Sequence, residues 1–125
     1  GLTTELSTDR VSMGETVRLT ARLDNRTEAV VPSPIARIGL PAGLSAQSWQ
    51  LEQLRERGIV AFYETRAREV TLYWDGIHTD EVHEVKLDLV AELPGRFTGP
   101  ASQAHPYYDD DEVAWQRGLT IEVTP

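Results

Sequence analysis

The sequence contains no cysteine, which excludes disulfides, a thiolate zinc site and a cysteine nucleophile. A chain of 125 residues does not need a disulfide to fold, because it is long enough to bury roughly two-thirds of its unfolded surface. The absence of cysteine therefore does not indicate the cellular compartment. We expect residues 1–125 to form one domain with a single core.

Positive charge is also scarce. The sequence has one lysine, Lys86, and eleven arginines, and its formal net charge is −8. No basic stripe is available to neutralise a phosphate backbone, so nucleic acid is not an expected partner.

Long apolar runs are missing as well, and none approaches the roughly 20 residues that a membrane-spanning helix needs. We therefore expect a soluble segment that does not insert into a membrane. No basic and then apolar leader precedes Leu2, and the chain begins with Gly1. These features favour a segment excised from a longer protein.

In much of the sequence, apolar residues recur at every second position. Strict alternation over residues 17–23 and 85–93 predicts two half-buried strands. Further strands, including a hairpin that turns at residues 66–68, are predicted at 35–40, 59–63, 70–74 and 119–123. About seven or eight strands with closely spaced turns and one helix indicate an all-β fold, an antiparallel β-sandwich.

The single predicted helix runs from Ser45 to Gly58. Its first residue or Ser48 can cap the free amides of the first turn, and the terminal glycine can end the helix. Leu51 and Leu54 lie one turn apart and predict the buried side, on which we also expect Trp49.

The segment from Pro94 to Trp115 concentrates surface chemistry, because turn residues are followed by a histidine, two tyrosines, four acids and a tryptophan. Tyr107 and Tyr108 are adjacent, so extended backbone would turn one ring to the core and the other outward. An exposed tyrosine of this kind is a common interface anchor. We expect Trp115 in the core.

The acid run consists of Asp109, Asp110, Asp111 and Glu112. Carboxylates suit calcium, but consecutive side chains of extended backbone point to opposite sides and rarely converge on one ion. The run also lacks the D-x-D-x-D-G order of a helix-loop-helix site. A solvated loop is favoured over a weak calcium site, and no other cofactor is expected.

No catalytic constellation is present. His78 and His83 are predicted to be surface residues, and His105, beside Pro106, is also more consistent with a structural role. No G-x-S-x-G motif marks a nucleophile. The triplet N-R-T at residues 25–27 matches a glycosylation acceptor, a pattern short enough to arise by chance. We expect a protein that is not an enzyme.

Three short motifs occur in order around the predicted helix. Residues 38–43 read I-G-L-P-A-G, residues 70–75 read V-T-L-Y-W-D, and residues 94–97 read P-G-R-F, followed by Pro100 and the tyrosine pair. From Val17 to Val123 this order resembles the C-terminal receptor-binding-type macroglobulin domain of the alpha-2-macroglobulin and complement superfamily. The resemblance implies a macroglobulin-like sandwich with one helix, excised from a larger protein that is bacterial, since arginine replaces lysine and disulfides are absent.

The resemblance also implies a function. Such proteins are extracellular or periplasmic protease inhibitors, attached in some cases to the cell envelope, and they often carry a reactive internal thioester. Their terminal domain is not catalytic; its partners are other domains of the same polypeptide and, through the full-length protein, proteases. In bacterial members an M-Y element shields the thioester, a role that would fall here to Tyr108, with Tyr107 in place of the methionine.

The receptor binding of animal members is not expected for this chain. Animal members bind an endocytic receptor through lysines on the helix, whereas this helix offers only Arg55 and Arg57 as a candidate interaction face. A second hypothesis is a stand-alone adhesive module that binds carbohydrate or calcium at a cell surface, suggested by the tryptophans, the tyrosines and the acid run.

Overall fold

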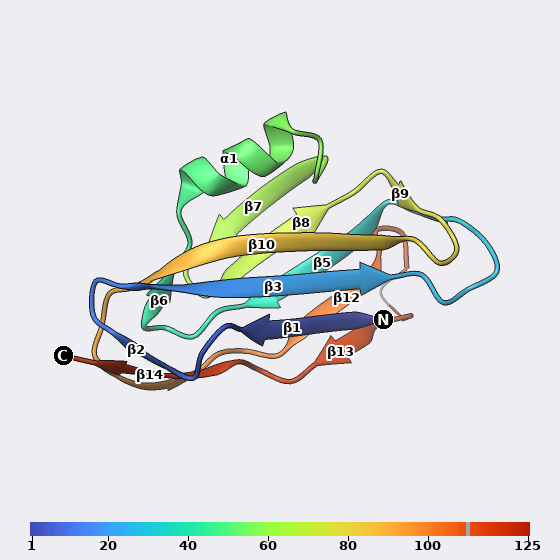
Figure 1. The fold of residues 1–125 in the computed structure, drawn as a ribbon. Coiled ribbons are helices and arrows are strands. Elements are labelled where there is room, and N and C mark those ends of the chain that lie inside the picture. Colours follow the sequence, from blue (N-terminus) through green and yellow to red (C-terminus); the bar gives the residue numbers. More distant parts are fainter. Residues whose placement is uncertain (110) are drawn as a thin grey trace.

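The computed structural model describes residues 1–109 and 111–125, which form a β-sandwich with one helix (Figure 1). This confirms the predicted fold class. The first half contains β1 (Leu2–Leu6), β2 (Arg10–Ser12), β3 (Thr16–Asp24), β4 (Val31–Pro32), β5 (Pro34–Gly39), β6 (Leu44–Ser45) and α1 (Ser48–Glu56). The second half contains β7 (Phe62–Arg66), β8 (Glu69–Tyr73), β9 (Gly76–Ile77), β10 (Val82–Ala91), β11 (Gly95–Thr98), β12 (Ser102–Pro106), β13 (Ala114–Gln116) and β14 (Thr120–Thr124).

Two antiparallel sheets make the layers of the sandwich. One has the strand order β1-β3-β10-β6, and the other has the order β13-β12-β5-β8-β7. A third sheet, β11-β14-β2, and the short pair β4-β9 complete the fold. Figure 1 shows β3 and β10 running across β5, β8 and β12, with α1 above β7. The alternation of apolar residues turns one face of each layer toward the other.

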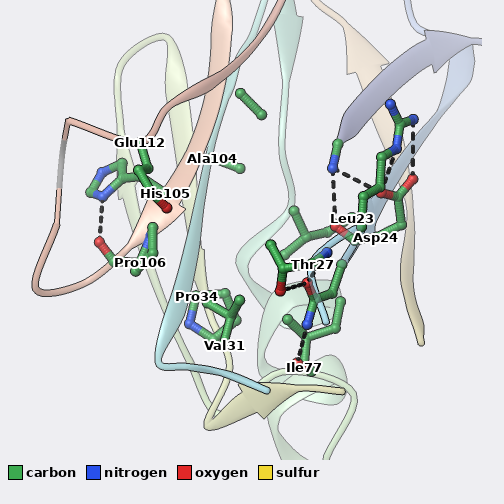
Figure 2. Close-up of a pocket in the computed structure, with 14 residues that line it drawn as sticks. Leu23, Asp24, Thr27, Val31, Pro34, Ile77, Ala104, His105, Pro106 and Glu112 are labelled. Carbon is green, nitrogen blue, oxygen red and sulfur yellow. Dashed lines mark hydrogen bonds and ion pairs between the residues drawn. The ribbon is translucent and has the colours of Figure 1, made fainter. Parts of the chain in front are cut away.

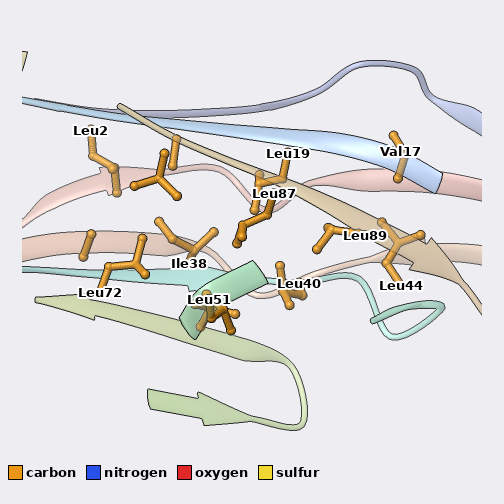
Figure 3. Close-up of a cluster of buried hydrophobic side chains, with 14 of the residues drawn as sticks. Leu2, Val17, Leu19, Ile38, Leu40, Leu44, Leu51, Leu72, Leu87 and Leu89 are labelled. Atoms are coloured by element: carbon orange, nitrogen blue, oxygen red, sulfur yellow. The ribbon is translucent and has the colours of Figure 1, made fainter. Parts of the chain in front are cut away.

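The core lies between these two layers. Leu19, Leu87 and Leu89 from the first sheet point toward Ile38 and Leu72 of the second (Figure 3). All five side chains are at most 2% exposed. Burying an aliphatic side chain of this size stabilises a fold by about 2 kcal/mol, so the period of two is the main determinant of the layers.

Strand bounds differ from the sequence prediction at several places. The strand expected to end at residue 93 ends at Ala91, and Leu93 is 53% exposed rather than buried. The strand expected at 59–63 lies at 62–66 instead. Leu2–Leu6 was not predicted, because threonines and a glutamate hide its alternation, yet it pairs with β3 along its whole length.

The helix is shorter than predicted. It spans Ser48–Glu56, because Ser45 belongs to β6 and pairs with Val90 of β10. The N-cap position is occupied by Gln47, whose side chain makes no capping hydrogen bond, so the predicted serine cap is wrong. The C-terminal prediction is confirmed: Gly58 has a φ of +72° and its amide donates to the carbonyl of Arg55 at 3.0 Å.

The burial of the helix is also only partly as predicted. Leu51 is fully buried and Leu54 is half-buried against the core. Trp49, however, is 60% exposed. It precedes Leu51 by two residues, which rotates it by about 200° around the helix axis and turns it away from the sheet.

A side chain fastens the helix to the edge of β10. The amide of Gln50 mimics a neighbouring strand: its Oε1 accepts from the backbone N–H of Asp88 at 2.8 Å, and its Nε2 donates to the Asp88 carbonyl at 3.1 Å. This pair of bonds satisfies backbone groups of β10 that no strand reaches.

Replacing Gln50 with alanine should therefore lower the free energy of unfolding by about 2 kcal/mol, because it leaves a half-buried donor and acceptor unpaired. The matched control is Gln53→Ala on the exposed side of the same helix, which should change the value by less than about 0.5 kcal/mol. Urea denaturation followed by circular dichroism measures both. Equal losses in the two variants would show that the bonds to β10 are not the cause of the effect.

Among the described residues, no helix is long and apolar enough to cross a membrane.

Candidate functional site

Exposed aromatic side chains gather at the β13 end of the five-stranded sheet. Tyr107 and Tyr108 form the turn that follows β12 and are 70% and 67% exposed. Trp115, on β13, is 64% exposed. The exposure of both tyrosines differs from the expectation of one ring in the core, and the reason is that a turn does not alternate its side chains as a strand does. The prediction of a buried Trp115 is also wrong.

Strand register explains why Trp115 is outside. Trp115 lies opposite Gln103, Gln103 lies opposite Arg37, and Arg37 lies opposite Thr71. Residues directly opposite one another in an antiparallel sheet share a face. The neighbouring Ala36 and Ala104 fill the inner face, so this row must point outward. The acid run ahead of Trp115 gave no signal of this register.

These residues enclose a groove of about 500 Å³ on the outer face of the sheet. We call it the aromatic groove. It is lined by Ile35, Arg37, Tyr73, Gln103, His105, Tyr107, Tyr108, Val113 and Trp115. Aromatic rings and Val113 supply apolar surface, while a guanidinium and a primary amide supply hydrogen-bonding groups. A groove of this size and mixture is typical of a ligand or docking site.

On the side away from β13, the aromatic groove borders β8, and β7 lies next to β8. The ring of Tyr73 lies 5.7 Å from that of Phe62, which is 54% exposed, and the tyrosine hydroxyl donates to the carboxylate of Glu64. That hydrogen bond, followed by burial, raises the pKa of Tyr73 above its usual value. The phenol therefore stays protonated and holds its ring in a fixed position.

His105 lies between two cavities. On the outer side it lines the aromatic groove, and on the inner side it lines a cavity of about 170 Å³ at the end of the sandwich. Figure 2 shows this end cavity between Leu23, Ile77 and Ala104, with the imidazole of His105 directed to the Pro106 carbonyl. The Nδ1–O distance is 2.7 Å, and the side chain is 9% exposed. His105 has the structural role that the sequence favoured.

The other two histidines differ from each other. His78 is exposed, as predicted. His83 is not a plain surface residue: its ring stacks on Trp74 at 5.2 Å, and its Nε2 lies 2.8 Å from the Gly76 carbonyl oxygen. His83 lies opposite the buried Leu23, so the alternation of β10 places it on the inner face of the sheet, and the prediction of a solvent-facing residue is wrong.

Two residues of the acid run, Asp109 and Asp111, are joined by a local hydrogen bond. The carboxylate of Asp109 accepts from the backbone N–H of Asp111 at 3.0 Å, and Glu112 is exposed. Asp110, the fourth residue of the predicted weak calcium site, lies outside the described residues. Within residues 1–109 and 111–125, no group of three histidine, aspartate or glutamate side chains is placed to hold a metal ion.

The helix cations lie on a different surface. Arg55 is paired with Glu52 one turn earlier, and Arg57 is exposed at the end of the helix. Glu52 also accepts from the hydroxyl of Tyr63 at 3.0 Å, and these hydrogen bonds, that from Arg55 first, lower its pKa. Arg55 is thus engaged in holding the helix to β7, and only Arg57 keeps its charge free of the described partners.

The sequence matches no family model and no curated protein. Solved structures of bacterial alpha-2-macroglobulins are similar to it over 99% of its length. The Salmonella protein reacted with methylamine has 16% identity and a TM-score of 0.75, and the trypsin-activated Escherichia coli protein has 14% identity and a TM-score of 0.80. An E. coli structure spanning domain MG7 to the C-terminus has 15% identity and a TM-score of 0.69.

The chain spans only 9% of the Salmonella chain, 10% of the trypsin-activated E. coli chain and 23% of the MG7-to-C-terminus chain. The order of motifs predicted this likeness, although each motif is short. The chain therefore has the fold of one domain of the bacterial alpha-2-macroglobulins.

Proposed function

We propose that residues 1–125 are a non-catalytic terminal domain of a larger alpha-2-macroglobulin-like protease inhibitor, and that the turn formed by Tyr107 and Tyr108 docks on a neighbouring domain. The observation that carries this proposal is the exposure of both rings, 70% and 67%, on a domain of this fold. Two adjacent exposed tyrosines are costly to leave in water and are well suited to an interface.

The related structures support this role. One is described as activated by trypsin and another as activated by elastase, and the Salmonella protein was reacted with methylamine. Methylamine is a small nucleophile, so its use points to a reactive acyl group in that protein. A tyrosine was replaced by glycine in a further Salmonella structure. By analogy, the protein that contains this chain would act outside the cytoplasm, in the periplasm or outside the cell.

The docked rings would have a chemical purpose. A reactive thioester is lost to hydrolysis when water reaches it, and an aromatic side chain packed over it excludes water. Tyr108, with Tyr107 beside it, is the pair that this chain presents for such shielding. The pair lies in the turn beyond β12, where both rings are exposed.

The test replaces Tyr108 with alanine in the full-length protein and follows methylamine incorporation over time in the absence of protease. We expect the reactive group to be lost roughly tenfold faster, because removal of the ring admits water. Trp49→Ala is the matched control: this side chain is also an exposed aromatic, at 60%, but it lies on the helix. It should leave the lifetime unchanged.

An unaltered lifetime in the Tyr108→Ala protein would remove the shielding role. If the sequence upstream of this chain has no C-x-E-Q motif, a thioester is excluded as the shielded group. Docking between the domains would then have to be measured directly.

A further inference from the structure

The aromatic groove has more aromatic side chains than docking through the tyrosine pair would use. Of the exposed aromatic side chains among the described residues, Phe62, Tyr107, Tyr108 and Trp115 lie on or beside this sheet face, and Trp49 alone lies elsewhere. Docking through the turn uses two of them and makes no demand on Trp115, which comes from a different strand.

Two polar side chains also line the aromatic groove. Arg37 is exposed, and neither its guanidinium nor the side-chain amide of Gln103 bonds to another side chain in the part of the chain that the structure describes. The two residues are cross-strand neighbours, so their donors and acceptors stand side by side. An apolar protein surface laid over them would leave these groups desolvated and unpaired, at a cost of about 1 to 3 kcal/mol each.

From these features we infer that the aromatic groove binds a neutral oligosaccharide. A sugar ring offers an apolar face of C–H bonds that stacks on an indole or phenol ring, and hydroxyl groups at its edge that pair with a guanidinium and an amide. Trp115 and the tyrosine pair supply the stacking rings, and Arg37 with Gln103 supply the polar groups. This combination satisfies both kinds of surface at once, which an apolar partner would not.

Charge argues for a neutral ligand. Asp109, Asp111 and Glu112 lie in the loop that carries the tyrosine pair, and the chain has a formal net charge of −8. Arg37 is the single cation that lines the groove. Polyanionic glycans and nucleic acids would therefore be repelled more than attracted. This inference goes beyond the docking role: a bound sugar and a docked domain would share Tyr107 and Tyr108, so each would exclude the other.

The test uses the 125-residue chain and a panel of neutral hexasaccharides, namely cellohexaose, chitohexaose, maltohexaose and xylohexaose, titrated to millimolar concentration. The three tryptophans each give an indole N–H signal in an NMR spectrum. We expect at least one sugar to shift the signal of Trp115 in a saturable way, whereas the signal of Trp74, which is 7% exposed, stays in place.

Variants assign the site. Trp115→Ala should weaken binding by about tenfold and Trp115→Phe should recover part of it, because phenylalanine keeps a stacking ring. Trp49→Ala, a matched loss of an exposed indole, should leave the affinity unchanged. Arg37→Ala and Gln103→Ala should each weaken binding several-fold.

The inference is overturned if none of the four hexasaccharides moves the Trp115 signal, in which case the face is a protein surface, or if Trp49→Ala and Trp115→Ala weaken binding equally. The isolated chain lacks any neighbouring domain, so these results are independent of the docking role. A failed shielding test with intact sugar binding, or the reverse, separates the two proposals.

Discussion

Replacement of Gly39 with alanine is expected to lower the free energy of unfolding by about 3 kcal/mol or more. A methyl group on Gly39 would lie 2.1 Å from the carbonyl oxygen of Pro100 and 2.8 Å from its carbonyl carbon. Both are backbone atoms, so no side-chain rotation relieves the overlap. The backbone N–H of Gly39 also donates to the Ser102 hydroxyl at 3.0 Å, and that serine is fully buried. This bond holds strand β5 in place, so it cannot move away from Pro100 to accommodate a methyl group.

The matched control is Gly76→Ala. The nearest atom to a methyl group there is the Val31 carbonyl oxygen at 3.6 Å, an ordinary contact, so the variant should stay within about 1 kcal/mol of the parent. Urea denaturation of both proteins, monitored by circular dichroism and tryptophan fluorescence, measures the difference. Similar losses in the two variants would mean that the close approach to Pro100 is not the source of the effect.

The same contacts give the sequence motifs a physical explanation. The segment L-P-A-G at residues 40–43 and the segment P-G-R-F at residues 94–97 lie against each other. A methyl group on Gly43 would come within 2.4 Å of the Phe97 ring, and one on Gly99 would meet the backbone of Leu40 at 2.8 Å. These short motifs mark places where a glycine lies so close to another backbone segment or to an aromatic ring that no Cβ fits. Their order could therefore identify the fold, although none is long.

Periodicity predicted the long strands because burial of alternate residues decides their position. Residues 17–23 and 70–74 fall almost wholly within β3 and β8. The short strands β12 and β13 escaped prediction: they lie in a segment of turn residues and acids, and β13 is only three residues long. The position of β12 depends on pairing with β5 across about 70 residues of sequence, and β13 in turn pairs with β12, which is a tertiary effect that local pattern does not contain.

The candidate site was predictable in its location but not in its composition. The tyrosine pair stood out because two large rings precede an acid run. Trp115 and Arg37 could not be joined to it, since their proximity comes from strand register. Apolar residues are usually buried, so the expectation of a core tryptophan followed the average behaviour of the residue type. An exposed tryptophan that violates this average is the stronger indication of a binding surface.

Replacement of Asn25 with alanine is expected to lower the free energy of unfolding by about 3 kcal/mol. Asn25 is 4% exposed, and its side chain closes the turn after β3 with four hydrogen bonds. Its Nδ2 donates to the carbonyls of Ala29 at 2.8 Å and Ile77 at 2.9 Å. Its Oδ1 accepts from the backbone N–H of Thr27 at 2.9 Å and from the threonine hydroxyl at 2.6 Å. Alanine would remove all four bonds, although the Thr27 hydroxyl would still donate to the Ala29 carbonyl at 2.9 Å.

Asn25→Asp tests which half of this network matters. An ionised carboxylate keeps the bonds from Thr27 but turns an acceptor toward the carbonyls of Ala29 and Ile77, so at neutral pH the loss should equal or exceed that of alanine. A carboxyl facing two carbonyls resists ionisation, and its protonated form can donate to one of them. The variant should therefore regain stability relative to the parent as the pH falls, which urea denaturation between neutral and mildly acidic pH would measure. Val30→Ala, at a side chain of the same loop that is 50% exposed and carries no charge, is the control and should show no such pH dependence. The asparagine of the triplet at residues 25–27 is thus a buried residue of a structural turn, and its amide already donates to two backbone carbonyls.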